Sequence, residues 1–135
     1  MSMFSIFNVS GSAISAQSQR LNVVASNLAN VDAVAGPDGK AYKARQAVFQ
    51  TVPMGTDGTA GVRVSNIQES DMPGKRIHDP SHPLADAEGY VSHSNVNAVE
   101  EMVNMISASR SYQNNLEVMN AAKSLLLKTL QMGQS

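Results

Sequence analysis

The last third of the chain carries one apolar stripe that limits what the whole chain can fold into. From position 102 to position 130 the stripe advances in alternating steps of three and four residues. That spacing places side chains on one face of an α-helix. Its members are Met102, Met105, Ser109, Tyr112, Leu116, Met119, Lys123, Leu126 and Leu130. Only two of these are polar, so the stripe predicts a surface that packs against another helix.

Signals for the beginning and the end of this helix flank the stripe. Asn97 followed by Glu100 has the spacing of a capping box, and Glu101 adds a second acid near the positive end of the helix dipole. Gly133 stands where a helix would end. We therefore predict one helix over about 97–131, roughly 35 residues and some 50 Å long. A helix of this length in so small a chain cannot be covered by its own domain.

The first 31 residues carry a weaker helical repeat. Its apolar members recur at intervals of seven and are Phe7, Ile14, Leu21 and Leu28. A period of 3.5 residues per turn is typical of helices that wrap around partner helices. A second row beside it is half Gly or Ser, and these residues form helices poorly in water. Packed against a neighbour, the same small residues would permit a close approach.

The middle of the chain is rich in turn residues. Residues 32–95 hold all five prolines and seven of the nine glycines. The sequence at 36–39, Gly-Pro-Asp-Gly, is a strong turn signal. Alternating patterns predict a strand over 42–52 and another from Val62 to about Ile67, joined by a glycine-rich loop. Shorter strands are expected at 76–78 and 90–91.

These patterns predict an α+β fold in which long N- and C-terminal helices form a coiled-coil-like pair around a small central β-containing domain. The expected segments are 1–31 (N-terminal helix), 32–95 (β-rich middle domain) and 96–135 (C-terminal helix). Two helices with one stripe each can cover one another and leave their other flanks bare. We expect them to become stable on assembly, because ordering each residue costs about 1–2 kcal/mol. The alternative is a monomeric helical hairpin.

Composition argues against several classes of function. The net charge of −1 lacks the surplus positive charge that nucleic-acid binders need. The longest apolar runs span three residues, whereas a membrane-spanning helix needs about 20, so we expect no direct membrane insertion. There is no cysteine, which excludes thiolate metal sites and cysteine nucleophiles.

The sequence also offers little for catalysis. His78 and His82 are four apart, but neighbouring prolines rule out a helix that would place both on one face. Glu100 and Glu101 are adjacent and would point in different directions. We therefore expect that the chain is not an enzyme and that it has no cofactor and no metal site. The methionines on the C-terminal stripe fit two interpretations, ordinary core filling or a contact surface that adapts to non-identical neighbours.

Several separated motifs resemble one known family. The sequence ASNLAN at 25–30 resembles the signature of the bacterial flagellar rod and hook axial proteins, and the run at 100–115, EEMVNMISASRSYQNN, resembles that family's second signature. The turn at 36–39 followed by Tyr42, and the stretch HPLADAEGYV at 82–91, resemble the short members of the proximal rod. The resemblance extends over nearly the whole chain.

This resemblance implies a structural axial subunit of the flagellar basal-body rod in the periplasm. Such a subunit polymerises into the driveshaft that carries torque from the membrane ring to the hook and encloses the export channel. The implied partners are other rod proteins, copies of the chain itself and the flagellar type III export apparatus, with the membrane ring adaptor and periplasmic rings as further partners. Export is expected without a cleaved signal peptide.

On this hypothesis the two stripes form the subunit interface. The expected interface residues are Phe7, Ile14, Leu21, Leu28, Met102, Met105, Tyr112, Leu116, Met119, Leu126 and Leu130. Asn27 and Asn30 are candidates on two grounds: they finish the first helix through the left-handed geometry that Asn tolerates, or they bind a neighbouring subunit, which the resemblance favours. Two rivals remain, another axial protein of the rod and hook family and a stand-alone periplasmic binding domain.

Overall fold

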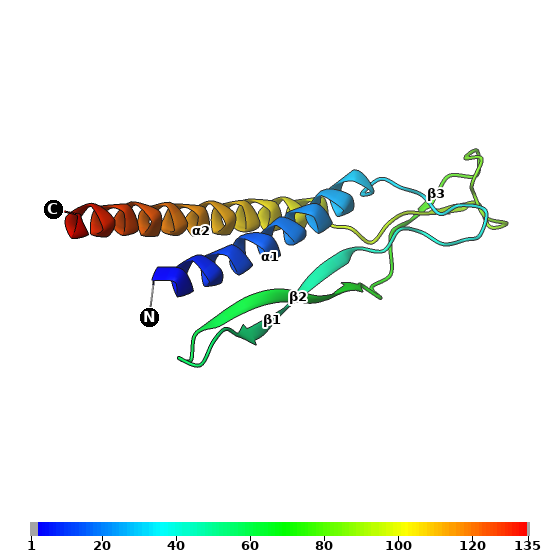
Figure 1. Cartoon of the computed structure of the whole chain (residues 1–135). Coiled ribbons are helices and arrows are strands. Elements are labelled where there is room, and N and C mark those ends of the chain that lie inside the picture. Colours follow the sequence, from blue (N-terminus) through cyan, green and yellow to red (C-terminus); the bar gives the residue numbers. More distant parts are fainter. Residues whose placement is uncertain (1–2, 135) are drawn as a thin grey trace.

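The fold consists of two long helices and two small antiparallel sheets (Figure 1). The computed structural model describes residues 3–134, so positions 1–2 and 135 of the predicted terminal segments lie outside it. In chain order the elements are α1 (Met3–Ala29), β1 (Arg45–Pro53), β2 (Ala60–Glu69), β3 (Arg76–His78), β4 (Tyr90–Ser92) and α2 (Ala98–Gly133). The predicted α+β class, with helices at both ends of the chain, is confirmed.

The C-terminal helix begins where its cap predicts. Asn97 has extended backbone angles, and its Oδ1 accepts hydrogen bonds from the amides of Val99 and Glu100 at 3.1 and 3.2 Å. These bonds satisfy two of the amides that lack partners in the first helical turn. The helix then runs for 36 residues to Gly133, close to the predicted 97–131. It lies antiparallel to α1 and extends past the beginning of α1 (Figure 1).

The two helices meet along a seam with a seven-residue repeat. One row of α2 in this seam consists of Glu101, Ala108, Asn115 and Ala122, of which all but Asn115 are buried. The other row consists of Met105, Tyr112, Met119 and Leu126. A Cβ placed on Gly11 of α1 would lie 3.6 Å from Cε of Met119. Small residues on both helices therefore bring the two backbones close together, as the sequence predicts.

The opposite face of α1 is covered by the hairpin of β1 and β2, which lies along the helix (Figure 1). The Ser12 hydroxyl accepts a hydrogen bond from the Val62 amide at 3.1 Å and donates one to the Val9 carbonyl at 2.7 Å. A Cβ on Gly61 would come within 2.7 Å of this hydroxyl. The expectation that both helices keep bare flanks is therefore wrong for α1, because the hairpin packs there. It holds for α2.

The strands match the predicted pattern with shifted ends. β1 and β2 pair antiparallel from Arg45 opposite Glu69 to Pro53 opposite Ala60, with a bulge between Val48 and Phe49. β3 and β4 form a separate sheet of two strands. The expected turn at 36–39 is present: the Gly39 amide donates to the Gly36 carbonyl at 2.9 Å, and Gly39 has a φ of 74°.

The segment after α1 returns beside the segment before α2. The Ala35 amide donates to the Ser92 carbonyl at 2.8 Å, and the Ser94 hydroxyl donates to the Val31 carbonyl at 2.7 Å. A Cβ on Gly74 would lie 2.2 Å from the His93 carbonyl oxygen, so this position has no room for a side chain. These contacts hold the sheet of β3 and β4 at the end of the helix pair.

The core is thin and built from small side chains. Among the described residues every buried apolar side chain is Ala or Val: Ala16, Val23, Val24, Ala35, Val91, Val96, Ala108 and Ala122. Larger apolar side chains are half-buried or exposed. Since burying a Leu or Ile contributes about 1.5–3 kcal/mol, most of the potential stabilisation by large side chains is not realised within one chain. Over residues 3–134 neither long helix is apolar enough to cross a bilayer.

Candidate assembly interface

The C-terminal stripe divides into a row along the seam and an exposed row. The row of Met105, Tyr112, Met119 and Leu126 lies along the seam with α1, where Met105 is 38% exposed and the other three side chains are half-buried. The row of Met102, Ser109, Leu116, Lys123 and Leu130 lies beside the seam, where Met102, Leu116 and Leu130 are 54%, 41% and 56% exposed. The sequence therefore located the face of α2 that packs on α1 only to within one residue. The stripe predicted Ser109 and Lys123 at two of its positions, but the neighbouring Ala108 and Ala122 are the residues buried against α1.

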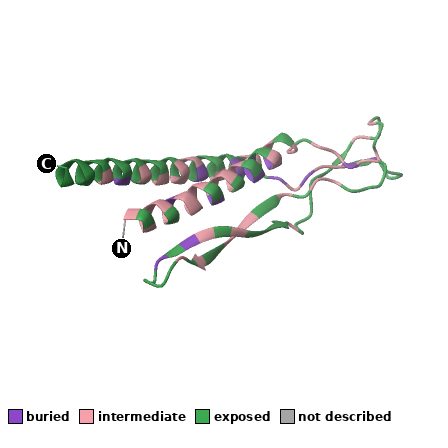
Figure 2. Ribbon diagram, viewed as in Figure 1, coloured by how far each residue is buried: buried purple, intermediate pink, exposed green. Residues whose placement is uncertain are grey.

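Figure 2 shows α2 as exposed over most of its length, and many of these exposed residues have large apolar side chains. At the beginning of the helix they are Val99, Met102, Val103, Met105 and Ile106, and towards its end they are Leu116, Val118, Leu125, Leu127, Leu130 and Met132. Monomeric soluble proteins rarely expose contiguous apolar patches of more than a few hundred Å². A helix with this surface is typical of a chain that buries it against other molecules.

The N-terminal stripe is less exposed than the C-terminal one. Phe7, Ile14, Leu21 and Leu28 are all half-buried, because α1 lies between α2 and the hairpin. Phe4 at the start of the helix is 68% exposed. The surface that α1 leaves for a partner is therefore limited to strips between its two intramolecular contacts. The assignment of both stripes to a subunit interface stays a prediction.

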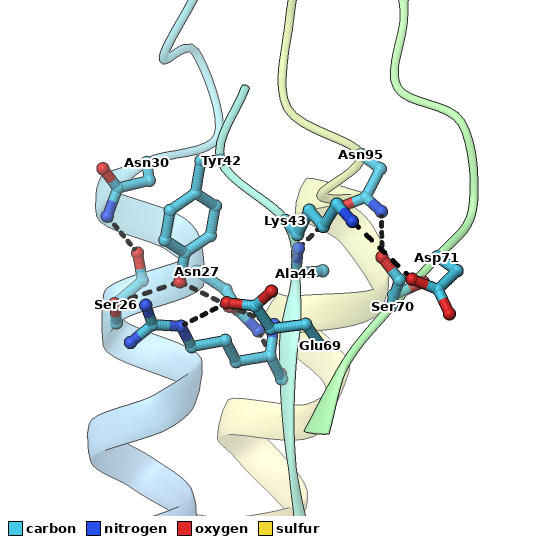
Figure 3. Close-up of polar contacts among 11 residues, drawn as sticks. Ser26, Asn27, Asn30, Tyr42, Lys43, Ala44, Glu69, Ser70, Asp71 and Asn95 are labelled. Carbon is cyan, nitrogen blue, oxygen red and sulfur yellow. Dashed lines mark hydrogen bonds and ion pairs between the residues drawn. The ribbon is translucent and has the colours of Figure 1, made fainter. Parts of the chain in front are cut away.

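Asn27 lies at the centre of a buried polar cluster (Figure 3). Its side chain is 0% exposed. Nδ2 donates to the Arg45 carbonyl at 2.7 Å and to Oε2 of Glu101 at 3.0 Å. Oδ1 accepts from the Tyr42 hydroxyl and from the Arg45 amide, both at 2.9 Å. These bonds use both donors and two acceptor positions of the amide, so Asn27 connects α1, α2 and the start of β1.

Glu101 is a member of this cluster that sequence reasoning missed. Its position in the first turn of α2 predicted only an acid that interacts with the helix dipole. The structure instead buries Glu101 to 9% exposure in the seam, with its carboxylate accepting from Asn27. The available signal was periodicity: Glu101 precedes Ala108 and Ala122 by multiples of seven residues. Buried carboxylates require hydrogen-bond partners, and Asn27 provides one.

Asn30 has a local role at the end of α1. Its side-chain Nδ2 donates to the Ser26 carbonyl at 2.8 Å, and its backbone amide donates to the carbonyls of Ser26 and Asn27, both at 3.2 Å. The expected left-handed geometry is wrong for both asparagines, because every positive φ among the described residues belongs to a glycine. The right-handed turn simply continues through Asn30, whose side chain satisfies a terminal carbonyl.

A second asparagine joins the hairpin to the helix pair. Asn95 Oδ1 accepts from the Ala44 amide at 2.6 Å, and its Nδ2 donates to the carbonyls of Ser70 and Met72 at 3.0 and 2.8 Å (Figure 3). Ala44 precedes β1 and Ser70 follows β2 at the open end of the hairpin. Asn95 therefore holds both strands of the hairpin beside the start of α2. Nothing local in the sequence marks Asn95 for this role.

Side chains of the sheet of β3 and β4, and of the loop that joins these strands, contact one another. The His78 ring packs edge-on against the Tyr90 ring, with 4.9 Å between the two ring centres. The guanidinium of Arg76 lies 4.7 Å from the centre of the Tyr90 ring and 2.9 Å from the Asp86 carboxylate. The backbone amide of Tyr90, followed by that of Glu88 and the guanidinium of Arg76, lowers the pKa of Asp86 below its ordinary value. Among residues 3–134, no group of three or more His, Cys, Asp or Glu could hold a metal ion.

Comparison with known proteins identifies two matching families. Residues 7–37 match a family of flagella basal body rod proteins, and residues 87–132 match the C-terminal family of the flagellar basal body rod FlgEFG proteins. These regions contain most of α1 and almost all of α2. Both helices that form the seam are thus the parts that these families describe.

Curated relatives cover the chain from end to end. A flagellar basal-body rod protein FlgC of Escherichia coli O157:H7 is 56% identical over 134 residues, covering 99% of this chain and 100% of the relative. The FlgC protein of Yersinia enterocolitica is 57% identical with the same coverage. That of Buchnera aphidicola subsp. Schizaphis graminum is 48% identical over 136 residues, again covering 99% and 100%.

Proposed function

This chain belongs to the family of FlgC flagellar basal-body rod proteins, and from that premise we propose how it serves as a structural subunit of the rod. Copies of the chain and other rod proteins assemble through the terminal helices into the proximal part of a driveshaft. The shaft transmits torque from the membrane ring to the hook and encloses the export channel. The subunit reaches this place through the flagellar type III export apparatus.

The observation that carries the proposal is the uncovered apolar surface of α2. Met102, Leu116 and Leu130 are each about half exposed although they belong to the stripe that predicts helix packing. Full burial of such a side chain contributes about 1.5–3 kcal/mol, so covering the exposed half of each would contribute roughly half of that. Because the core of one chain contains only Ala and Val among its buried apolar side chains, contacts between subunits supply the burial of large side chains.

The proposed interface follows the exposures. It comprises the half-buried stripe residues of α1, Phe7, Ile14, Leu21 and Leu28, and the exposed stripe residues of α2, Met102, Met105, Leu116 and Leu130. Tyr112, Met119 and Leu126, which are also half-buried, support it from the seam. Asn27 is left out of the proposed interface because it is fully buried and its amide is bound within the chain. Residues 32–95, with the hairpin lying on the side of α1 away from α2, form the outer domain of the subunit.

Electron microscopy of basal bodies tests this proposal. A strain that lacks the chain should contain membrane rings without a completed rod and hook, and expression of the full chain should restore both. Intact hooks and filaments in the deletion strain would show that the chain does not build the rod. Expression of residues 1–119 should fail to restore the rod, because this truncation removes the part of α2 that follows Met119.

A further inference from the structure

A groove with a volume of about 770 Å³ lies between α1, the start of α2 and the open end of the hairpin. Its lining has an apolar part and a charged part. The apolar part comes from α1 and β1 and consists of Val23, Val24, Ala47 and Phe49. The charged part comes from both helices and both strands of the hairpin and consists of Arg20, Arg45, Glu69, Glu100 and Glu101. A group that fits this groove therefore combines an apolar portion with a charge.

Glu101 is the buried carboxylate of this groove, whereas Glu69 and Glu100 are exposed. Its Oε2 accepts the hydrogen bond from Asn27, but its Oε1 has no hydrogen-bond partner within residues 3–134. Every buried side-chain oxygen or nitrogen of these residues has a partner, so Oε1 must reach the solvent of the groove that Glu101 lines. Charged side chains are almost never buried unless an opposite charge pairs with them. The Asn27 amide is neutral, so the charge of Glu101 lacks such a partner.

The cations of the chain do not neutralise Glu101. Arg45 pairs with Glu69, with 3.8 Å between Nε and Oε1, and Arg20 Nη1 donates to Oε1 of Gln17 in its own helix at 3.5 Å. Over the described part of the chain, no ion pair includes Glu101. The same residues contain no group of three or more His, Cys, Asp or Glu that could hold a metal ion. A cation for Glu101 must therefore come from another molecule.

We propose that this groove receives a basic side chain, Lys or Arg, from a neighbouring subunit of the rod. Such a side chain has an apolar stem and a cationic end, which are the two portions that the groove fits. The stem packs on Val23, Val24 and Phe49, and the cationic end binds Oε1 of Glu101. The contact requires one charge at one position, unlike the packing of apolar helix faces. This inference rests on the proposed function, because the neighbour is another subunit of the same shaft.

Glu101→Gln tests whether the charge is required. The new amide keeps an acceptor for Asn27 and removes a buried charge that has no cation. The purified variant should therefore unfold at a higher denaturant concentration than Glu100→Gln, which loses the same helix-dipole interaction at an exposed position. Cells that express Glu101→Gln should nevertheless lose the rod and motility. Glu117→Gln, at an exposed position of α2 outside the groove, is the matched control and should remain motile.

Asn104→Lys tests the groove from within the chain. Asn104 lines the groove three positions after Glu101, and residues three apart are neighbours on a helix surface. The introduced lysine should pair with Glu101 and occupy the groove, so the purified variant should unfold at a higher denaturant concentration while cells lose the rod. Adding Glu101→Gln should abolish the stabilisation by the lysine, because the two substitutions act on one pair. Ser124→Lys adds the same charge outside the groove and should retain the rod.

Electron microscopy of isolated basal bodies, together with motility, provides the decisive comparison. Normal rods in cells with Glu101→Gln or with Asn104→Lys would overturn the inference and leave the rod function intact. A Glu101→Gln chain that unfolds at a lower denaturant concentration than Glu100→Gln would also overturn it, because the carboxylate would then act within the single chain. Basal bodies that are complete in a strain lacking the chain would overturn the proposed function itself.

Discussion

Asn27 near the end of α1 donates a hydrogen bond to Glu101 in the first turn of α2, across 3.0 Å in space and 74 positions in sequence. The bond lies in the same row of the seam as the buried Ala108 and Ala122 and satisfies a buried carboxylate. A buried polar pair of this kind can fix the register of two helices, because sliding either helix would break the bond and leave the buried Glu101 carboxylate without this partner. Asn27 also binds both backbone polar groups of Arg45, so the same residue sets where the hairpin begins relative to the helices.

The first prediction concerns the stability of this cluster. Asn27→Ala should lower the free energy of unfolding by about 1–3 kcal/mol or more, because it leaves the Glu101 carboxylate and the Arg45 amide without their partner in a buried place. Chemical denaturation of the purified chain, followed by circular dichroism, measures the change. A combined Asn27→Ala and Glu101→Ala variant should lose less than the sum of the single losses, because each substitution breaks the same bond.

Asn30→Ala is the matched control for this cluster. It removes a side-chain bond to the Ser26 carbonyl at a half-buried helix end, so we expect a smaller loss of stability. Equal losses for Asn27→Ala and Asn30→Ala would contradict a special role for the buried cluster.

The sequence predicted the elements well and their packing less well. Helix ends at Asn97 and Gly133 follow from capping and glycine chemistry, which act locally. The strands near 45–53, 60–69, 76–78 and 90–92 follow from alternation between turn residues. The seam was displaced by one residue because hydrophobic patterns favour the largest side chains, whereas α1 packs on Ala108 and Ala122. The large side chains of the neighbouring row, Met102, Leu116 and Leu130, remain outside the seam, where the proposed assembly would use them.

Long-range polar contacts were beyond the reach of sequence reasoning. Asn27 and Glu101 look like ordinary polar helix residues, and nothing local indicates that they meet. Asn95 similarly binds one amide and two carbonyls from segments 23 to 51 positions away. Such bonds depend on how finished elements are placed, so they emerge only from the tertiary structure.

A second prediction tests the close approach of the helices. Ala122 is 4% exposed in the seam, whereas the adjacent Ala121 is exposed. Ala122→Leu should destabilise the chain by about 1–3 kcal/mol, because added methylenes force the helix backbones apart. Ala121→Leu should change stability by less than about 0.5 kcal/mol. Thermal unfolding of the two variants distinguishes them, and equal melting temperatures would contradict the seam described here.

A third prediction concerns Gly74, which precedes β3. Gly74→Ala should displace the backbone or weaken the bond between the His93 amide and the Lys75 carbonyl, now 2.7 Å long, because the new Cβ would collide with the His93 carbonyl oxygen. Faster hydrogen exchange at the His93 amide would report this loss. Gly133→Ala, which meets nothing within 4 Å at the end of α2, should leave that exchange rate unchanged. Unaltered exchange in both variants would show that position 74 tolerates a side chain.

A fourth prediction concerns pH. The Asp86 carboxylate accepts hydrogen bonds from the amides of Tyr90 and Glu88, each at 2.9 Å, and these lower its pKa in the folded chain. A lowered folded-state pKa means that Asp86 contributes stability above its unfolded pKa and loses that contribution as the pH falls through the folded value. Carboxyl carbon shifts should therefore place the Asp86 midpoint below the ordinary value for aspartate. In Asp86→Ala the Tyr90 amide should lose protection at neutral pH. A midpoint at or above the ordinary value would contradict the bonding described.

The last prediction separates assembly from folding. Leu116→Asp places a charge in the exposed row of the C-terminal stripe, beside the seam. The free energy of unfolding of the monomer should therefore change by less than about 0.5 kcal/mol. Cells that express this variant should nevertheless lose the rod and motility. Leu126→Asp is expected to abolish assembly too, but Leu126 is half-buried in the seam, so a loss there would also reflect a weakened helix pair. Ser124→Asp on the polar back of α2 is the matched control and should retain motility. Motile cells with rods of normal length in Leu116→Asp would show that the exposed stripe does not join subunits. A monomer strongly destabilised by the same substitution would show that Leu116 acts within the chain.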